Sequence, residues 1–514
     1  RQLKCTEKFM IYSEAISSKT GEKIPLFTDK KPMHSKYNPH AEFLSETVVE
    51  GFYVIGGIGG SFHIKTLLDK LGKDSFVLAV EEDDDSLSFS LESGITSIVS
   101  QDKRVQFCTI SELENKLKNL YLPVLYSSFF YLSQRAWETH AGNSALKIKA
   151  IIQDTLSSIS ADYSVQAHFG KQWQKNILQN LMQIKPCKAP FVPPDKSASI
   201  IAAGPSLDKS INELKQNIGK TVVFCTDTAY QTLQKHSIEP DYIVSIDCQN
   251  LSLEHFRIYD TPDKNKKACV ILDLGSSPAI ARFMRKRGHD VYFTSSFHPL
   301  AKMAADRFNI PVISSGSGTV AIAACDIARL GGARTIRLYG ADFAYSGGKP
   351  YVRGTYLDSI YGRNCTRTNP SEAMFSALMY RTELKDCKPL FSANLENPRT
   401  SSVLESYSDA LLSWAENNSY EYENGCFNLK TRENAILENQ DSIDSGEFLI
   451  NLSEHLEKLL QKSILELKND EFFYGVLPFM AWEKNWLKDN NITIFEHLKL
   501  AYYAIKRYTI FYEK

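Results

Sequence analysis

A regular alternation of short apolar runs with amphipathic stretches most constrains what this chain can fold into. It extends from residue 199 to residue 339, and helical spacing separates most of the runs. The predicted strands are 199–203, 222–225, 242–246, 268–272, 291–294, 312–314 and 335–339. Strands this apolar, each hidden on both faces, are typical of a parallel sheet with helices on either side. The pattern therefore predicts an α/β fold with a doubly wound, Rossmann-like central domain.

The chain on either side of this pattern predicts two further domains. Residues 51–80 predict a strand, a glycine turn, a helix and a second strand, which is the order of a Rossmann-like unit. The first forty residues are polar and are expected to be irregular. A proline-rich break at 191–196 and a change to strand-free amphipathic helices from about 441 give the boundaries. The predicted domains are N-terminal α/β (1–190), central (191–435) and C-terminal helical (436–514).

Composition excludes several broad classes of protein. Apolar residues make up 43% of the 514 and charged residues 23%, as in an ordinary globular protein. Because 59 basic residues face 60 acidic ones, no global field favours nucleic acid or an anionic membrane, and an anionic ligand needs a local site. The ten cysteines lack metal-binding spacing, so we expect reduced thiols, no zinc and a cytoplasmic location. No apolar run approaches the roughly 18 residues that a membrane span needs.

The loop after the first central strand is a candidate anion site. Gly204 allows close backbone approach, Pro205 suits the first turn of a helix, and the Ser206 hydroxyl sits at the helix start. Free amides at such a helix start can bind a phosphate. The alternative interpretation is an ordinary turn in which Ser206 caps the helix.

Later loops in the same domain place more polar groups after strands. Thr226 and Asp227 follow the second strand, and Asp247 follows the third. The Ser/Gly-rich stretch 314–319 forms a second amide-rich helix start that can hold an anion. Because the carboxyl ends of parallel strands line one crevice, these loops are expected to converge. The Gly-Gly-Lys turn at 347–349 lacks the spacing of a phosphate-binding P-loop.

These motifs, with the stretch from Gly340 to Lys349, resemble the motility accessory factor (Maf) family of bacterial flagellin glycosyltransferases. The central domain of that family is also found in archaeal-type 6-hydroxymethylpterin diphosphokinases, and the resemblance covers about residues 195–435. A Tyr-Asn-Pro segment at 37–39 is similar to a motif near the start of such proteins. The resemblance implies transfer of a nonulosonic acid, a sialic-acid-like sugar, from its CMP-activated form to Ser or Thr of flagellin. It implies a role in motility and no required cofactor or metal.

The same core is similar to a family of bacterial sialyltransferases. Those enzymes hold the nucleotide on a Gly-Pro-Ser-Leu turn and bind the leaving phosphate with two tyrosines, six residues apart, after a Gly-x-Asp-Phe motif. Tyr345 and Tyr351 have this spacing after 340–343. Two phenol donors would stabilise charge as CMP leaves. The implied nucleotide-sugar-binding residues are Gly204, Pro205, Ser206, Thr226, Ser317, Gly318, Thr319, Asp342, Tyr345, Lys349 and Tyr351.

The general base departs from the sialyltransferase pattern. Those enzymes use a histidine in the lid segment, but this chain has no histidine between His298 and His455. A strand-end carboxylate beside bound substrate can have its pKa raised toward working pH, so Asp247 and Asp227 are the catalytic candidates on position. His298 also follows a strand and is the third candidate. An unidentified residue, or no base at all, stays open.

Two other segments have open interpretations. The apparent insertion at about 351–385 is rich in Tyr, Arg and Asn and is either a lid over the nucleotide-sugar or a solvated loop. The glycine turn at 56–60, with Glu81 or Glu82 after the next strand, is either a cofactor site or a degenerate scaffold that recognises the protein acceptor.

Two other functions compete with the glycosyltransferase. One is a diphosphokinase that acts on a pterin alcohol with ATP, which would need Mg²⁺ on carboxylates such as Asp227 and Asp247. The other is a non-catalytic protein that binds flagellin or a nucleotide, which the missing lid histidine keeps open.

Overall fold

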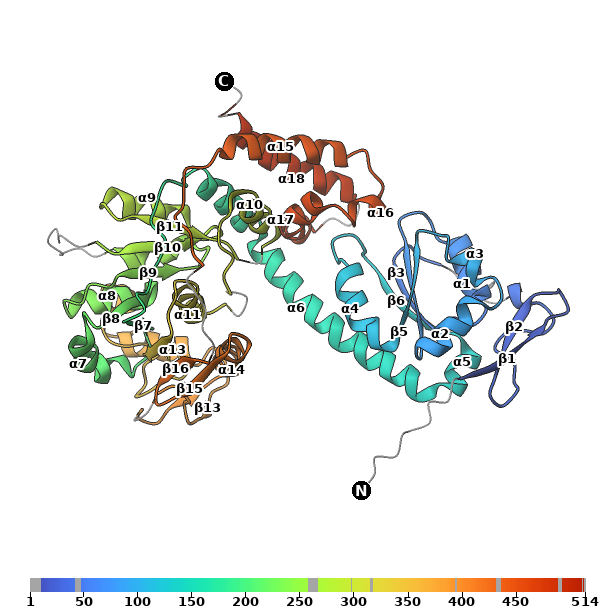
Figure 1. Cartoon of the computed structure of the whole chain (residues 1–514), viewed down its shortest axis with the longest axis horizontal. Helices are drawn as coiled ribbons and strands as arrows, with labels where there is room; N and C mark the ends of the chain where they lie inside the picture. The colour runs from blue at the N-terminus through green and yellow to red at the C-terminus, as the bar shows by residue number, and fades with distance from the viewer. Residues whose placement is uncertain are drawn as a thin grey trace. The chain divides into compact units, whose positions relative to one another are not determined.

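The computed structural model divides the chain into two compact units, each built from separate segments (Figure 1). One unit comprises residues 1–170 and 454–503, and the other 171–453 and 504–514. The predicted division at 190 and 435 stays a prediction. The structure describes residues 11–41, 48–257, 267–296, 298–314, 318–392, 395–430, 436–488, 492–510 and 512.

The second unit is built on one eight-stranded sheet with the order β11-β10-β9-β8-β7-β12-β16-β15. Its strands are β7 (Ser197–Ile201), β8 (Thr221–Thr226), β9 (Tyr242–Ser245), β10 (Cys269–Asp273), β11 (Val291–Thr294), β12 (Thr335–Tyr339), β15 (Tyr420–Glu423) and β16 (Cys426–Leu429). The six strands from β11 to β12 are parallel, which confirms the predicted α/β fold. The antiparallel hairpin β15–β16 extends the sheet beyond β12 and was not predicted. At the predicted strand 312–314 only a bridge between Ser295 and Val312 forms.

Helices between these strands bury the apolar runs. They are α7 (Leu207–Asn217), α8 (Asp227–Lys235), α9 (Pro278–Lys286), α10 (Pro299–Phe308), α11 (Val320–Leu330), α12 (Tyr356–Asn364), α13 (Ser371–Met379) and α14 (Ser402–Asn417), with the 3-10 helix η2 (Asn250–Phe256). Nine of the eleven residues of α11 are buried, and four of them are alanines. Their small side chains let α11 pack closely over β7, β8 and β9.

The strand order creates a crevice beside β7. From β7 the chain runs outward through β8, β9, β10 and β11, and then returns to place β12 on the other side of β7. The loops that leave β7 and β12 therefore depart in opposite directions. Open α/β sheets bind ligands at such a switch point, at the carboxyl ends of the strands.

The first unit contains a smaller parallel sheet with the order β5-β4-β3-β6. Its strands are β3 (Phe52–Gly56), β4 (Phe76–Glu81), β5 (Val105–Thr109) and β6 (Phe129–Ser133). Its helices are η1 (Pro39–Ala41), α1 (Phe62–Lys70), α2 (Asp84–Leu91), α3 (Thr96–Val99), α4 (Ile110–Leu120) and α5 (Arg135–His140). This arrangement confirms the predicted N-terminal Rossmann-like sheet.

The expected irregular structure of the first forty residues is wrong. An antiparallel hairpin forms from β1 (Tyr12–Ser17) and β2 (Lys23–Phe27). Four of the five β2 residues are buried, and the rings of Tyr12 and Phe27 stack with centroids 5.6 Å apart. Burial of this face stabilises a hairpin that its polar outer face conceals in the sequence.

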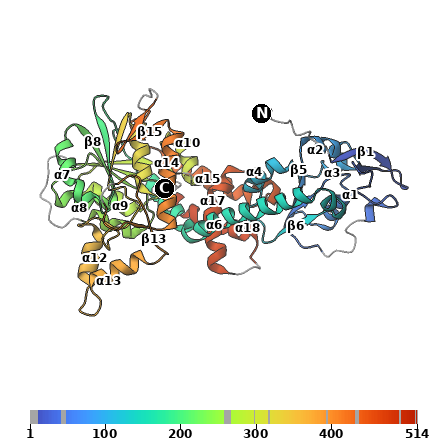
Figure 2. The ribbon, with the colours of Figure 1, turned by 90° about the horizontal axis from the view of Figure 1, so that it is seen from below.

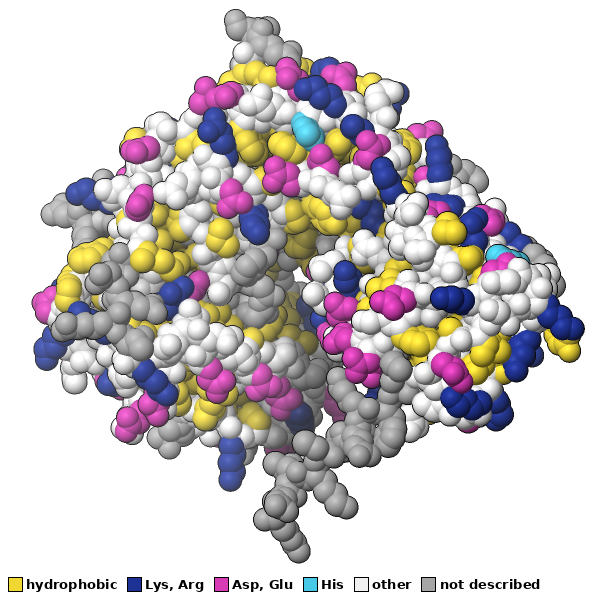
Figure 3. Space-filling view, turned by 45° about the vertical axis from the view of Figure 1, so that its right-hand side comes forward, with side chains coloured by type: hydrophobic (Ala, Val, Ile, Leu, Met, Phe, Trp, Pro, Cys, Tyr) yellow, Lys and Arg dark blue, Asp and Glu magenta, His cyan; other side chains and the backbone are white. Residues whose placement is uncertain are grey.

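Long helices make up most of the remainder. They are α6 (Gly142–Leu181), α15 (Ser445–Leu459), α16 (Ile464–Leu467), α17 (Glu471–Leu487) and α18 (Ile494–Thr509). Among the described residues beyond 441 no strand forms, as predicted. On the face shown in Figure 3, basic and acidic side chains are interspersed, in keeping with the near-zero net charge.

In the part of the chain that the structure describes, no helix is both long and apolar enough to cross a membrane.

Candidate functional site

A cavity of about 330 Å³ opens at the switch point of the larger sheet. It is lined by the loops after β7, β8 and β12, by the start of α11, and by α14. Its lining residues are Ala202, Ala203, Gly204, Thr226, Thr228, Gly318, Thr319, Val320, Ala321, Gly340, Ala341, Asp342, Phe343, Ala344, Tyr345, Pro350, Tyr351, Leu404 and Tyr407. The predicted convergence of strand-end loops is thus present, and most of its polar lining groups are hydroxyls.

Two glycines bring the first and last of these loops into contact. The Gly204 N–H donates to the Gly340 carbonyl at 2.7 Å. A Cβ on Gly204 would lie 2.4 Å from that carbonyl oxygen, and Gly340 has a φ of +65°. Larger residues would therefore push the two loops apart at the mouth of the cavity.

We expect Gly204→Ala to weaken this junction by about 2 kcal/mol, since an added methyl group cannot fit against fixed backbone. The measurement is thermal stability together with binding of the nucleotide. Gly362→Ala is the matched control, because nothing lies within 4 Å of a Cβ at this position of α12. Equal behaviour of the two variants would contradict the close-approach argument.

Asp342 lines the cavity and joins three segments of the chain. Its Oδ2 accepts from the Ser206 N–H at 2.7 Å, and its Oδ1 accepts from the hydroxyls of Ser206 and Ser392. Burial raises the pKa of this carboxyl, while the three donors lower it. The Ser206 amide and hydroxyl, which were predicted to face a phosphate, are thus directed at Asp342. Pro205 and Lys349 are half-buried and do not line the cavity.

The loop after β8 presents a threonine to the cavity and turns its carboxylate away. Thr226 is 3% exposed, and its Oγ1 has no hydrogen-bond partner among the described residues. Asp227 accepts from the Thr228 N–H at 2.7 Å and from the Ser245 hydroxyl at 2.6 Å. The unpartnered Thr226 hydroxyl is therefore available to a ligand, whereas Asp227 stabilises the strand ends.

The start of α11 forms another wall of the cavity. Gly318 has a φ of +77°, and the capping residue Thr319 makes no side-chain cap. The amides at this helix start favour an anion. A Cβ on Gly318 would lie 3.7 Å from the Tyr407 hydroxyl on α14. Ser317 lies outside the described residues.

Both predicted tyrosines line the cavity. Backbone hydrogen bonds of 2.8 and 3.0 Å between Tyr345 and Arg399 fix the first in place. Tyr351 retains 37% of its accessible surface, but burial around its phenol raises the pKa well above the ordinary value. Burial raises the pKa of Tyr345 as well. Both phenols are therefore protonated hydrogen-bond donors at neutral pH.

None of the three catalytic candidates lines the cavity. Asp247 is half-buried and accepts from the Gln249 N–H at 3.0 Å and the Ser252 hydroxyl at 2.7 Å. His298 caps α10 through its Nδ1, and burial lowers its pKa to about 4. The structure thus brings together the predicted ligand-binding loops but not a base.

Sequence reasoning missed three residues near these sites. Asp273 ends β10 and is 3% exposed, so the strand-end rule that selected Asp227 and Asp247 could have found it. Tyr407 reaches the cavity from α14, and Ser392 reaches Asp342 from a segment 50 residues further along the chain. No local pattern marks these last two.

The insertion at 351–385 holds two helices. Figure 2 shows α12 and α13 side by side at the lower edge of this unit, and the rings of Tyr361 and Phe375 join them with centroids 4.9 Å apart. The Arg353 carbonyl accepts from the Thr232 hydroxyl at 3.1 Å, which anchors the start of the insertion. Its role as a lid stays a prediction.

The glycine turn of the first unit is filled by protein. Glu81 is fully buried and accepts from five donors, among them Trp137 Nε1 at 2.7 Å and the Ile58 N–H at 3.0 Å. A Cβ on Gly57 would lie 2.4 Å from the Trp137 ring. The carboxylate predicted as one ribose ligand is thus used to hold the turn, which favours the scaffold interpretation over a cofactor site.

We expect Glu81→Gln to destabilise this unit by about 2 kcal/mol, because an amide leaves buried donors such as the Trp137 N–H unpaired. Hydrogen exchange of the β4 amides measures the change. Glu92→Gln, at an exposed position, is the control. An equal response of both variants would show that the five contacts contribute nothing.

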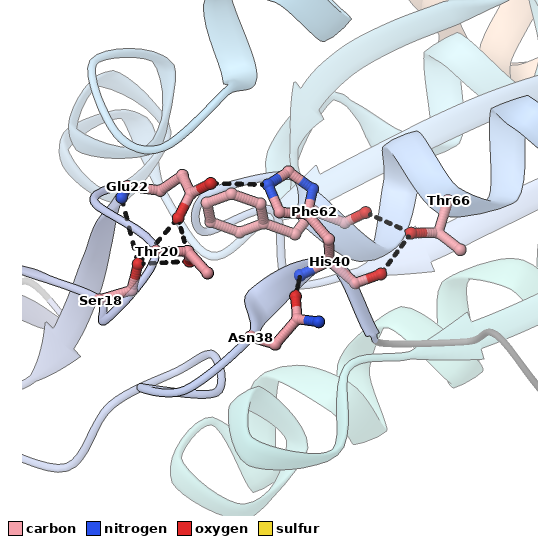
Figure 4. Close-up of polar contacts among 7 residues, drawn as sticks. All are labelled: Ser18, Thr20, Glu22, Asn38, His40, Phe62 and Thr66. Carbon is pink, nitrogen blue, oxygen red and sulfur yellow. Dashed lines mark hydrogen bonds and ion pairs between the residues drawn. The ribbon is translucent and has the colours of Figure 1, made fainter.

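The Tyr-Asn-Pro segment is tied to the hairpin and to α1 (Figure 4). His40 Nε2 lies 2.9 Å from Glu22 Oε1. The backbone N–H of His40 donates to Asn38 Oδ1 at 3.1 Å. The Thr20 and Ser18 hydroxyls, the largest causes, lower the pKa of Glu22 to about 2. The Thr66 hydroxyl on α1 donates to the His40 carbonyl at 3.4 Å. These contacts give the segment a structural role.

Within the described ranges, no group of three or more His, Cys, Asp or Glu side chains is placed to hold a metal ion.

Fold and cavity together define a Rossmann-type α/β protein with a ligand site at the switch point of its sheet. Residues 171–348 match the family described as 6-hydroxymethylpterin diphosphokinase MptE-like, which confirms the predicted core. The match begins where the second compact unit begins.

An uncharacterised protein of Treponema pallidum (strain Nichols) is 33% identical over 163 residues, which are 31% of this chain and 77% of that protein. The chain belongs to the same family as this spirochaete protein. A second uncharacterised protein of the same strain is 37% identical over 113 residues, and the matched region is 22% of this chain and only 40% of that protein. A solved structure described as "Structure of MAf glycosyltransferase from Magnetospirillum magneticum AMB-1" is similar over 99% of this chain and 92% of that chain, at 12% identity and a TM-score of 0.47.

Proposed function

We propose that this chain is a glycosyltransferase of the Maf type. It would transfer a nonulosonic sugar from its CMP-activated form to Ser or Thr of flagellin in the cytoplasm, in support of flagellar assembly. The observation that carries the proposal is the meeting of Tyr345 and Tyr351 with the start of α11 in one cavity. This is the set of groups that the motif resemblance implies for a CMP-sugar.

The lining chemistry suits a phosphate that becomes a leaving group. The described lining residues include hydroxyls, backbone amides and the Asp342 carboxyl, which Ser206 and Ser392 hold, but no Lys, Arg or His. As the bond from the anomeric carbon to the phosphate oxygen breaks, charge grows on CMP, and the phenols of Tyr345 and Tyr351 would donate to it. Thr226 Oγ1, which has no partner among the described residues, supplies a further donor. In the proposed glycosyltransferase, the protein's own groups stabilise the leaving CMP, and no cofactor is required.

The acceptor hydroxyl would attack the anomeric carbon and lose its proton to a base. Among the three candidates we keep Asp247 first, because it is half-buried at a strand end, whereas Asp227 is buried. Both oxygens of each carboxylate accept hydrogen bonds from the protein, so exposure is what separates the two. A strain with Asp247→Ala, in which the protein still folds, should carry unmodified flagellin. Normal glycosylation there would remove Asp247 from the mechanism.

The description of the matched family favours a second candidate, an ATP-dependent pterin diphosphokinase. That enzyme would hold Mg²⁺ on Asp227 and Asp247. Asp227 already accepts three hydrogen bonds from the protein and Asp247 two, so metal binding would have to displace donors such as Ser245 and Ser252. A non-catalytic protein that binds flagellin or a nucleotide is the third candidate.

Calorimetric titration of the full chain with CMP and with ATP, each with Mg²⁺ and with EDTA, separates these functions. The glycosyltransferase should bind CMP equally well in both conditions. Binding of ATP alone, and only with Mg²⁺, would overturn the proposal in favour of the kinase. Transfer of sugar from a CMP-activated donor to flagellin, followed by intact mass, separates catalysis from binding alone.

A further inference from the structure

At the carboxyl ends of β10 and β11, two buried polar atoms have no hydrogen-bond partner among the residues that the structure describes. They are Asp273 Oδ2 and His298 Nε2, and neither belongs to the cavity beside β7. Because all parallel strands of this sheet end at the same edge, the two groups share that edge with the cavity. Buried groups of this kind cost free energy unless a ligand satisfies them.

Asp273 offers an acceptor when it is ionised, which burial delays until the pH exceeds its pKa of about 7. It ends β10 with 3% exposure, and its Oδ1 accepts from the Gly275 N–H at 2.6 Å and the Ser296 hydroxyl at 3.4 Å. These two contacts hold the carboxyl so that only Oδ2 remains without a donor among the described residues.

His298 offers a donor. Its Nδ1 accepts from the Leu300 N–H at 3.2 Å, so this nitrogen carries no proton. The neutral ring must then carry its proton on Nε2, and burial lowers the pKa to about 4, which keeps the ring neutral at pH 7. Ser296, two residues before His298, donates its hydroxyl to Asp273 Oδ1, so the loop that carries this N–H donor contacts the carboxyl.

The indole of Trp173 lies beside His298 and beside Gly275, two residues after Asp273. Its ring packs edge-to-face on His298 with centroids 5.7 Å apart. A Cβ on Gly275 would lie 2.9 Å from Asp273 Oδ1 and 3.7 Å from Trp173 Cδ1. Asn176 Nδ2, one turn further along α6, donates to the Gly275 carbonyl at 2.8 Å and holds the helix over these loops.

We propose that Asp273 and His298 bind hydroxyl groups of a sugar, with Trp173 as the apolar wall. The sugar is the glycosyl portion of the nucleotide-linked donor, so the inference rests on the proposed function. A sugar hydroxyl both donates and accepts, and it can satisfy Asp273 Oδ2 and His298 Nε2 together. The ionised Asp273 carboxylate would repel a phosphate. A metal ion would find no lone pair on His298 Nε2, because this nitrogen carries a proton. The C–H face of a sugar ring covers an indole well.

Calorimetry with CMP and with CMP-N-acetylneuraminate tests this assignment on the full chain. The titrations are run at pH 8, above the Asp273 pKa of about 7, so that the carboxylate is ionised and Oδ2 accepts. Asp273→Asn keeps an acceptor for Gly275 but turns Oδ2 into a donor. His298→Asn keeps a cap for Leu300 but removes the inward N–H. Each variant should lose about tenfold in affinity for the nucleotide-sugar and retain its affinity for CMP, which also reports that it has folded.

The matched control is His289→Gln. His289 is half-buried in the same unit, two residues before the amino end of β11, and its Nδ1 lies 2.8 Å from the Ala268 carbonyl. It should leave both affinities unchanged. CMP binding with no extra affinity for the nucleotide-sugar in the unaltered protein, or equal nucleotide-sugar binding in all variants, would overturn the sugar site alone. No CMP binding in the unaltered protein would overturn the proposed function and the sugar site with it.

Discussion

Tyr345→Phe and Tyr351→Phe should each lower the rate of sugar transfer by about 10²- to 10³-fold. Both phenols line the cavity, and burial raises their pKa, so each is a neutral donor that loses only its O–H in the variant. A donor aimed at developing charge contributes more to the transition state than to the bound substrate. We therefore expect the loss in single-turnover rate, followed by flagellin mass, to exceed the loss in CMP affinity.

Tyr380→Phe is the control for the tyrosine pair. Tyr380 belongs to the insertion, is 59% exposed and does not line the cavity. Removal of the Tyr380 hydroxyl in this variant should change the transfer rate by less than twofold. If the Tyr345→Phe/Tyr351→Phe double variant retains a tenth of the normal rate, the phenols are not the groups that stabilise the leaving phosphate.

The larger sheet could be predicted because its strands are apolar on both faces. All six residues of β8 are buried, so its apolar run reads clearly in the sequence. The strands of β15–β16 are four residues each, and β15 alternates Tyr with Glu. Such short edge strands depend on pairing with β12, which no local pattern encodes.

The candidate site could be predicted as a set of loops but not as a set of side-chain directions. The strand-end rule places Ser206, Thr226 and Asp227 at one edge of the sheet. Which of them faces a ligand depends on distant partners, and Asp342, 136 residues from Ser206, captures its hydroxyl and amide. Thr226 has no such partner among the described residues, so it alone of the three offers an unpaired group.

Asp273 should make the larger unit less stable as the pH rises from 4 to 7. Burial raises its pKa from 3.8 to about 7, so over this range the folded chain retains a proton that the unfolded chain has lost. Stability from this group is therefore fully present below pH 4 and is lost as pH rises through 7. At 1.36 kcal/mol per pKa unit the change is about 4 kcal/mol.

The Asp273→Asn variant isolates this effect, because its amide does not titrate and other groups cancel in the comparison. Relative to the unaltered chain, its free energy of opening should rise by about 4 kcal/mol between pH 4 and pH 7.5. Hydrogen exchange of the β10 amides measures this, since it reports the opening of the unit that contains them. Asp358→Asn in the insertion would not serve as a control, because the half-buried Asp358 accepts from the Gly354 N–H. Asp386→Asn does serve: its side chain is 94% exposed, its solvent-exposed ion pair with Arg399 at 3.4 Å contributes little to stability, and it should show no such trend. Parallel pH profiles for Asp273→Asn and the unaltered chain would mean that Asp273 is already ionised in the folded protein, and that its Oδ2 is paired.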